Sequence, residues 1–417
     1  MNKNIKLAVA GAILATASVA NAGIIIPAGE WTLDIGGNVN MYSSWSNSKG
    51  RNTIIGSPLA SAGTSADSKT TNGMGNGLLP NFLSVSGSTR QNDLDVGFTI
   101  SLQPGSANNS ALSQVGATPA ATAAQGAVNG GLNNRQSFIT FGDKSWGSVK
   151  VGKDLGIFAS DAILSDITLL GVGGAAAGGG NTSLGRIGFG YMYADWKPQI
   201  AYTTPNMNGF QATAGITQAF LASGGNDGLT VSSATNASVG YEGKASYSFN
   251  ANGVDGKVWV SGIAQRVGSF GATGNDDTVA YAGDIGAKAS VAGFDVVGYY
   301  YGGSGIGLEG QFMNGYGLNA TGKLEARDAN GGYVQFAYTL PTKTKVAYSW
   351  GGSYLDKTGA SDVATLVDSN EMHDLMVIHP LTKHLNLVAE YSYQQAEAHS
   401  GIKNEKNVGS LGAILFF

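Results

Sequence analysis

The chain of 417 residues contains 64 glycines and no cysteine, and only 12% of its residues are charged, about half the ~25% usual in soluble domains. A soluble protein of this length needs a charged, hydrated surface, so the composition favours a protein whose surface faces lipid. The absence of cysteine excludes a thiol nucleophile, a thiolate metal site and a disulfide framework. With 24 basic against 28 acidic side chains, no basic face for nucleic acid is expected.

The first residues have the pattern of a secretory signal peptide. Lys3 and Lys6 precede an apolar run at residues 7–19, which ends in Ala20-Asn21-Ala22. This run is shorter than the roughly 20 apolar residues of a membrane-spanning helix, and small residues follow it as at a signal peptidase site. We therefore predict a signal peptide at residues 1–22 and one mature domain at residues 23–417. A retained amphipathic anchor is the alternative.

After this segment, apolar residues alternate with small or polar ones along many stretches. Examples are residues 96–103, 334–340, 346–354 and 385–394. In a bilayer every backbone polar group must be bonded internally, so only helices and closed β-barrels can span it, and barrel strands alternate in this way. A soluble β-sandwich would alternate similarly. The low charge and the tyrosines near strand ends favour the barrel.

Short turns and long loops alternate as the connections between the expected strands. The short turns are expected at residues 90–93, 143–146, 204–209, 250–255, 292–293, 341–344 and 382–384. The long loops are expected at residues 44–79, 104–134, 154–194, 221–236, 268–278, 302–330, 355–370 and 396–405. This pattern predicts an all-β fold, a 16-stranded antiparallel transmembrane β-barrel wide enough for an aqueous channel. A barrel of 18 strands is the alternative.

Three stretches resemble the general porins of Gram-negative bacteria. Residues 134–153 and 199–210 are similar to the porin hairpins on either side of the third loop, and the final strand ends in an aromatic residue, Phe417. The resemblance implies a homotrimer in the outer membrane, in contact with lipid and lipopolysaccharide. It implies a channel through which small polar solutes and ions diffuse passively, with an inward-folded third loop whose acidic groups face a basic wall. It also implies that Phe417 is the signal read by the barrel assembly machinery.

Carried over residue by residue, the resemblance gives six constriction residues. They are Lys153, Arg135, Arg186 and Lys197 on the basic side, and Asp161 and Asp166 on the acidic side. Lys153 stands where the family usually has arginine, and Lys197 and Arg186 are alternatives for one position. The family's Pro-Glu-Phe-Gly element is replaced by residues 170–173, Leu-Gly-Val-Gly, and residues 82–85 lack an arginine. We therefore expect a less charged, more apolar constriction, and the sign of its ion selectivity stays open.

Sequence features that would indicate another function are few. His373, His379 and His384 cluster in the sequence with Asp374, but no hydrolase elbow or zinc-protease motif accompanies them, so no enzyme, cofactor or metal site is predicted. Acidic loop tips such as residues 226–227 and 275–277 could bind Ca²⁺ or lipopolysaccharide. The rival functions are a substrate-selective channel and a structural or adhesive barrel that binds through its long loops.

Overall fold

A computed structural model describes residues 23–50, 52–59, 70–106, 132–174, 181–219, 231–232, 238–269, 276–319, 321, 323–359 and 362–417. The expected signal peptide lies outside the described residues, as do the loop tips at 226–227 and 275. Among the described residues, no helix is long and apolar enough to cross a bilayer.

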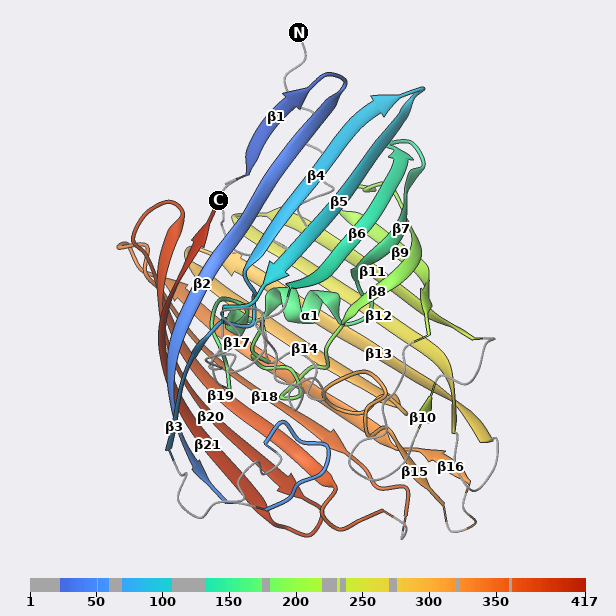
Figure 1. The fold of residues 1–417 in the computed structure, drawn as a ribbon, viewed down its shortest axis with the longest axis vertical. Coiled ribbons are helices and arrows are strands. Elements are labelled where there is room, and N and C mark those ends of the chain that lie inside the picture. The colour runs from blue at the N-terminus through green and yellow to red at the C-terminus, as the bar shows by residue number, and fades with distance from the viewer. Residues whose placement is uncertain are drawn as a thin grey trace, which may run out of the picture.

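The described strands form one closed antiparallel barrel of sixteen strands (Figure 1). They are β2 (Trp31–Lys49), β4 (Phe82–Gln91), β5 (Leu94–Pro104), β6 (Leu132–Asp143), β7 (Gly147–Leu155), β8 (Trp196–Thr203), β9 (Phe210–Gln218), β11 (Val239–Ala251), β12 (Val254–Ser269), β13 (Asp276–Val291), β14 (Phe294–Ser304), β17 (Asp328–Thr339), β18 (Lys345–Leu355), β19 (Val367–Pro380), β20 (Leu385–Ala398) and β21 (Lys403–Phe416). Pairing of β2 with β21, from Asn38↔Phe416 to Lys49↔Glu405, closes the ring. The predicted strand number is confirmed, and the sandwich and the 18-stranded barrel are wrong.

A few short elements accompany the barrel. β1 (Ile24–Ala28) and β3 (Thr70–Gly75) pair with β2, and β10 (Val231–Ser232) pairs with β12. β15 (Tyr316–Leu318) and β16 (Leu324–Ala326) form a separate hairpin between β14 and β17. The segment between β7 and β8 contains α1 (Ser160–Ser165) and the 3-10 helix η3 (Ile167–Leu170).

All seven short turns fall where the sequence predicts them. The barrel strands also bracket the eight predicted long loops, parts of which lie outside the described residues, and β2 extends to Lys49, into the range predicted for the first loop. The pairs Asn92–Asp93, Asn252–Gly253 and Ala292–Gly293 form two-residue turns in which every φ is positive. Such turns match the twist of adjoining strands and favour Asn, Asp and Gly. In Figure 1 the loop elements β10, β15 and β16 lie at the opposite end of the barrel from the C-terminus.

The outer and inner faces of the barrel differ in chemistry. Along β13, Val279, Tyr281 and Ile285 are more than half exposed, whereas Ala280 and Asp284 between them are buried. The same alternation recurs around the ring, which leaves a continuous apolar outer surface suited to lipid. Charged and polar side chains of the strands lie mainly on the buried face.

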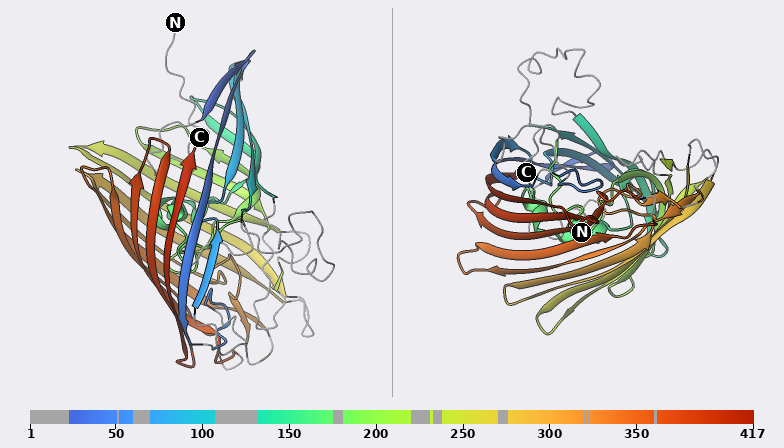
Figure 2. Two further views of the ribbon diagram at one scale, coloured as in Figure 1. Left: turned by 60° about the vertical axis from the view of Figure 1, so that its left-hand side comes forward. Right: turned by 90° about the horizontal axis from the view of Figure 1, so that it is seen from below.

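Two loop segments pack against that buried face. Phe158 and Tyr191 from segment 156–194, and Ile306 and Phe312 from segment 305–327, share one apolar cluster with wall residues such as Tyr333. Figure 2 shows the barrel from two further directions, with α1 drawn in green near its middle. The packed core of this protein therefore consists of loop residues and the inner wall.

Candidate functional site: a charged cluster against the inner wall

Asp161 in α1 is bound by two lysines of the wall. Its Oδ2 lies 2.9 Å from Nζ of Lys244 on β11, and its Oδ1 forms an ion pair with Lys257 on β12. Burial by itself would raise the pKa of Asp161, but the two lysines outweigh burial and hold the pKa below its usual range. The predicted acidic residue thus faces a basic wall, although not the basic residues that the sequence comparison selected.

A third lysine stands beside this pair. Lys288 on β13 lies directly opposite Lys257 in the strand register. Lys257 alternates with exposed Val258 and Val260, so its side chain belongs to the inner face. The prediction missed Lys244, Lys257 and Lys288, and the same alternation along β11 to β13 could have found them.

Asp166 and Arg186 form a second, fully buried pair. Nε of Arg186 lies 3.7 Å from Oδ1 of Asp166, and Tyr191 donates its hydroxyl to Asp166 over 2.8 Å. Arg186 also donates to the backbone oxygen of Met372 over 3.1 Å and to the hydroxyl of Ser349. These two predicted residues lie together, and they tie the loop to β18 and β19.

Lys197 occupies another anchoring cluster, on β8. Its ammonium group forms an ion pair with Glu242 of β11, whose other oxygen accepts the backbone N–H groups of Ile157 and Phe158 over 2.7 and 2.8 Å. Lys197 also donates to the side chain of Gln311. Both Lys197 and Arg186, the two alternatives for one position, are therefore almost completely buried.

Arg135 and Lys153 lie apart from the Asp161 cluster. Arg135 is buried, donates to Asn181 over 3.3 Å and stacks 5.9 Å above the ring of Trp196. Lys153 is paired in register with Ser137 and Pro198, both exposed on the outer face, and donates to the backbone oxygen of Asn134 over 2.9 Å. The structure therefore does not bring Lys153 to the other predicted constriction residues.

Lys150 takes the inner face of β7 in place of Lys153. It forms an ion pair with Asp154 and lies 4.9 Å above the ring of Phe138, which is buried. The three-residue offset between Lys150 and Lys153 is odd, so alternation puts the two side chains on opposite faces.

Glu390 on β20 contacts the loop at the candidate site, and sequence reasoning missed it. Its carboxylate accepts the backbone N–H groups of Val172 and Gly173 over 2.7 and 3.0 Å, and the hydroxyl of Ser410 over 3.2 Å. A carboxylate from the wall therefore holds the backbone of residues 172–173, in the stretch that stands in place of the family's Pro-Glu-Phe-Gly element. Asp374, buried on β19, neighbours Glu390.

The histidines do not form a catalytic group with Asp374. His373 lies on the exposed face of β19 and bonds to the hydroxyl of Tyr348 over 2.8 Å, while Asp374 is on the buried face. His379 bonds to Thr344 over 2.9 Å. Within the described ranges, no group of three or more His, Asp or Glu side chains could hold a metal ion.

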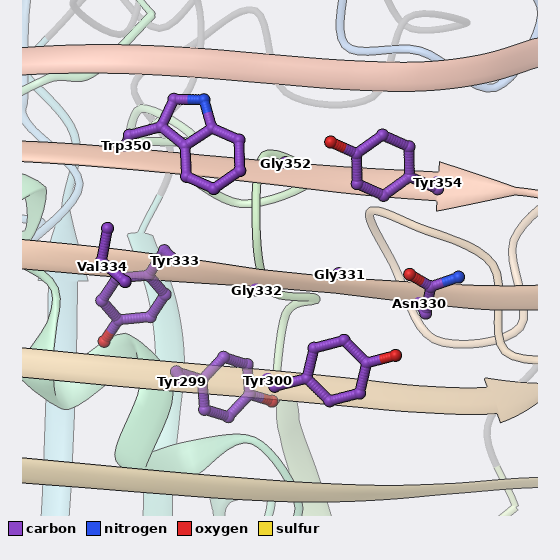
Figure 3. Close-up of a pocket in the computed structure, with 10 residues that line it drawn as sticks. All are labelled: Tyr299, Tyr300, Asn330, Gly331, Gly332, Tyr333, Val334, Trp350, Gly352 and Tyr354. Atoms are coloured by element: carbon purple, nitrogen blue, oxygen red, sulfur yellow. The ribbon is translucent and has the colours of Figure 1, made fainter.

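A groove of about 240 Å³ lies on the outer face of the wall (Figure 3). Tyr300, Trp350 and Tyr354 line it, and Gly332 and Gly352 are opposite each other in register beneath them. Tyr300 and the adjacent Val334 are exposed on the lipid side of the barrel. This groove is therefore separate from the charged interior and is not part of the solute path.

The comparisons with known proteins agree with this architecture. A family model described as Gram-negative porin matches residues 8–399. The chain belongs to the Gram-negative porin family. No curated protein sequence matches this porin at a significant level.

Several solved structures, among them outer-membrane proteins, are similar to this porin in fold. The channel DcaP of Acinetobacter baumannii is similar over 94% of this porin and 99% of its own chain, with a TM-score of 0.68 and 15% identity. OmpF of Salmonella typhi, solved with daunomycin, is similar over 94% of this porin and 100% of its own chain, with a TM-score of 0.56 and 13% identity. A trimer form of OmpT from Vibrio cholerae is similar over 93% of this porin and 99% of its own chain, with a TM-score of 0.52 and 12% identity.

Proposed function

We propose that this porin forms a water-filled channel in the outer membrane, through which small hydrophilic solutes and ions diffuse passively. The observation that carries the proposal is the closed sixteen-stranded barrel, apolar outside and charged within. A barrel of this size has room for an aqueous path. It is not proposed to catalyse a reaction or to hold a cofactor.

Segment 156–194 is the proposed third loop, folded inward to narrow this channel. Support comes from its bonds to four different parts of the buried wall, through Glu242 on β11, Ser261 on β12, Gln335 on β17 and Glu390 on β20. A loop held on several sides has one defined position, as a size filter requires. Asp161 and the lysines beside it form the proposed charged edge of the constriction.

The remaining constriction residues have different proposed roles. Arg186 with Asp166, and Lys197 with Glu242, are proposed to hold the loop in place, because both pairs are almost fully buried. Arg135 is proposed to position Asn181 on the loop side. Lys153 is left out of the constriction because it lies on the outer face.

A homotrimer embedded in outer-membrane lipid and lipopolysaccharide is the proposed assembly. The trimer form of the OmpT structure supports it. Export through a cleaved signal peptide at residues 1–22, and recognition of Phe417 by the barrel assembly machinery, remain part of the proposal on sequence grounds. A substrate-selective channel and an adhesive barrel are the competing functions.

Planar bilayer recording tests the channel. Purified protein should insert in detergent-free lipid and produce stepwise, persistent conductance in KCl. Protein that inserts as a folded barrel but passes no current would contradict the channel and favour a structural or adhesive role.

A further inference from the structure

We propose that Lys244, Lys257 and Lys288 form a binding station for small oxyanions that carry two negative charges. This inference rests on the proposed channel and gives it a preferred solute class. The station lies on β11, β12 and β13, beside α1.

The three lysines have too few carboxylates to balance them. Among the residues that the structure describes, Asp161 is the one carboxylate within ion-pair distance of this group, and it contacts Lys244 and Lys257. Lys288 has no ion pair there. Three ammonium groups and one carboxylate leave an excess of about two positive charges at pH 7.

Other nearby carboxylates are committed to other partners. Asp154 pairs with Lys150, Glu242 with Lys197, and Asp295 with Lys345 at 2.7 Å. Asp284 is buried, accepts the hydroxyl of Tyr299 over 3.1 Å, and stands four positions from Lys288 along β13, about 13 Å away along the strand. The excess positive charge therefore remains with the lysine group.

The register puts this excess into a small area. Lys257 and Lys288 are directly opposite each other, so their Cβ atoms are about 5 Å apart. Like charges at such positions repel, and an anion between them removes the repulsion. Lys244 reaches the same carboxylate from β11, on the other side of β12. Lys244 and Lys257 therefore share Asp161, and Lys288 lies across the register from Lys257 on the same inner face.

Accessibility distinguishes this group from the buried cations. The side chains of Lys244 and Lys257 are each 23% exposed, whereas those of Arg186 and Lys197 are 0% and 3% exposed. A solute in the lumen can therefore reach the lysines.

An oxyanion of charge two can accept charge-assisted hydrogen bonds from two ammonium groups at once, which a monovalent ion does less well. Flexible lysines also allow release, as transport requires.

The experiment measures block of the chloride current by added anions. Sulfate and malonate should reduce the single-channel KCl current of the wild type reversibly, whereas acetate at equal concentration should have little effect. In Lys288→Gln, the half-blocking concentration of both divalent anions should rise about tenfold, because one charge-assisted partner is lost. The reversal potential in a KCl gradient should shift toward cations.

Two further variants make the result specific. Lys383→Gln makes the same change in net charge at an exposed turn between β19 and β20, and its block should equal that of the wild type. Lys288→Arg keeps the charge and should retain the block. The binding station is wrong if the half-blocking concentration is unchanged in Lys288→Gln. It is also wrong if Lys383→Gln or Lys288→Arg raises that concentration as much as Lys288→Gln does. In both cases the conducting channel itself stands. A folded wild type without conductance would instead remove the channel itself.

Discussion

Arg186 and Asp166 meet within one loop segment, with Nε of the arginine 3.7 Å from Oδ1 of the aspartate and neither side chain exposed. The pair sits where the resemblance placed a water-facing constriction, yet water does not reach it. Its second set of contacts, to Met372 and Ser349 on the wall, explains why. The two charges act as an internal brace between the loop and the barrel.

Replacing the arginine should loosen this brace. Arg186→Met leaves Asp166 buried without its cation, which typically costs 3–5 kcal/mol. We expect a lower thermal unfolding midpoint in detergent and larger, noisier channel currents. Arg266→Met is the control, because Arg266 and Asp277 form an exposed pair worth about 0–1 kcal/mol. Equal midpoints for the two variants would show that Arg186 does not brace the loop.

Asp161 controls the charge of the proposed constriction. Asp161→Asn frees Lys244 and Lys257 from their carboxylate, so anion preference should rise by roughly twofold or more. Reversal potentials in a KCl gradient measure this change. An unchanged reversal potential would place Asp161 outside the ion path.

The difference in reversal potential between the wild type and Asp161→Asn should depend on pH in a way that follows from the lowered pKa of Asp161. A carboxylate whose pKa lies below the ordinary 3.8 stays ionised as pH falls from 7 to about 5. The reversal potentials of wild type and Asp161→Asn should therefore differ by a constant amount over that range. The difference should vanish only at lower pH, as Asp161 is protonated. Convergence near pH 5 or 6 would contradict the lysine pairing.

Local patterns predicted the barrel well and the site only partly. Alternation and turn residues such as Asn252–Gly253 are signals within a few residues, so strand number and turn positions could be predicted. Lys153 was selected by resemblance, although Val151, two positions earlier, is paired in register with exposed Ile139 and Ile200, which places Lys153 on the outer face. The alternation pattern was thus the better guide at this position.

The remaining site contacts have no local signal. Glu390 binds the backbone of Val172 and Gly173, which are more than two hundred positions earlier in the chain. Asp161 meets Lys257 only because the barrel closes and the loop packs against β12. Such contacts depend on the whole fold, and a single sequence shows only the two separate residue types.

Glu390→Gln tests the contact that holds residues 172–173. An amide offers one acceptor oxygen where the carboxylate offers two, so one backbone N–H loses its partner, at a cost of about 1–3 kcal/mol. We expect increased open-channel noise and an altered conductance. Glu371→Gln is the matched control, because Glu371 lies on the other face and accepts the hydroxyl of Tyr354 over 2.9 Å. Quiet, wild-type currents in Glu390→Gln would exclude this anchor.

Phe417 makes backbone contacts with the first barrel strand and has a proposed second role, and variants can separate the two. Its backbone closes the barrel, donating to the oxygen of Gly37 over 3.1 Å and accepting the N–H of Gly37 over 2.8 Å. Its ring is the proposed assembly signal. Phe417→Ala keeps both backbone bonds but lacks the ring, so a several-fold drop in folded, heat-resistant barrel in the outer membrane would come from recognition. Phe417→Tyr should assemble normally. If Phe417→Ala assembles like the wild type while deletion of Phe417 does not, barrel closure is the role of this residue, and the ring is not a signal.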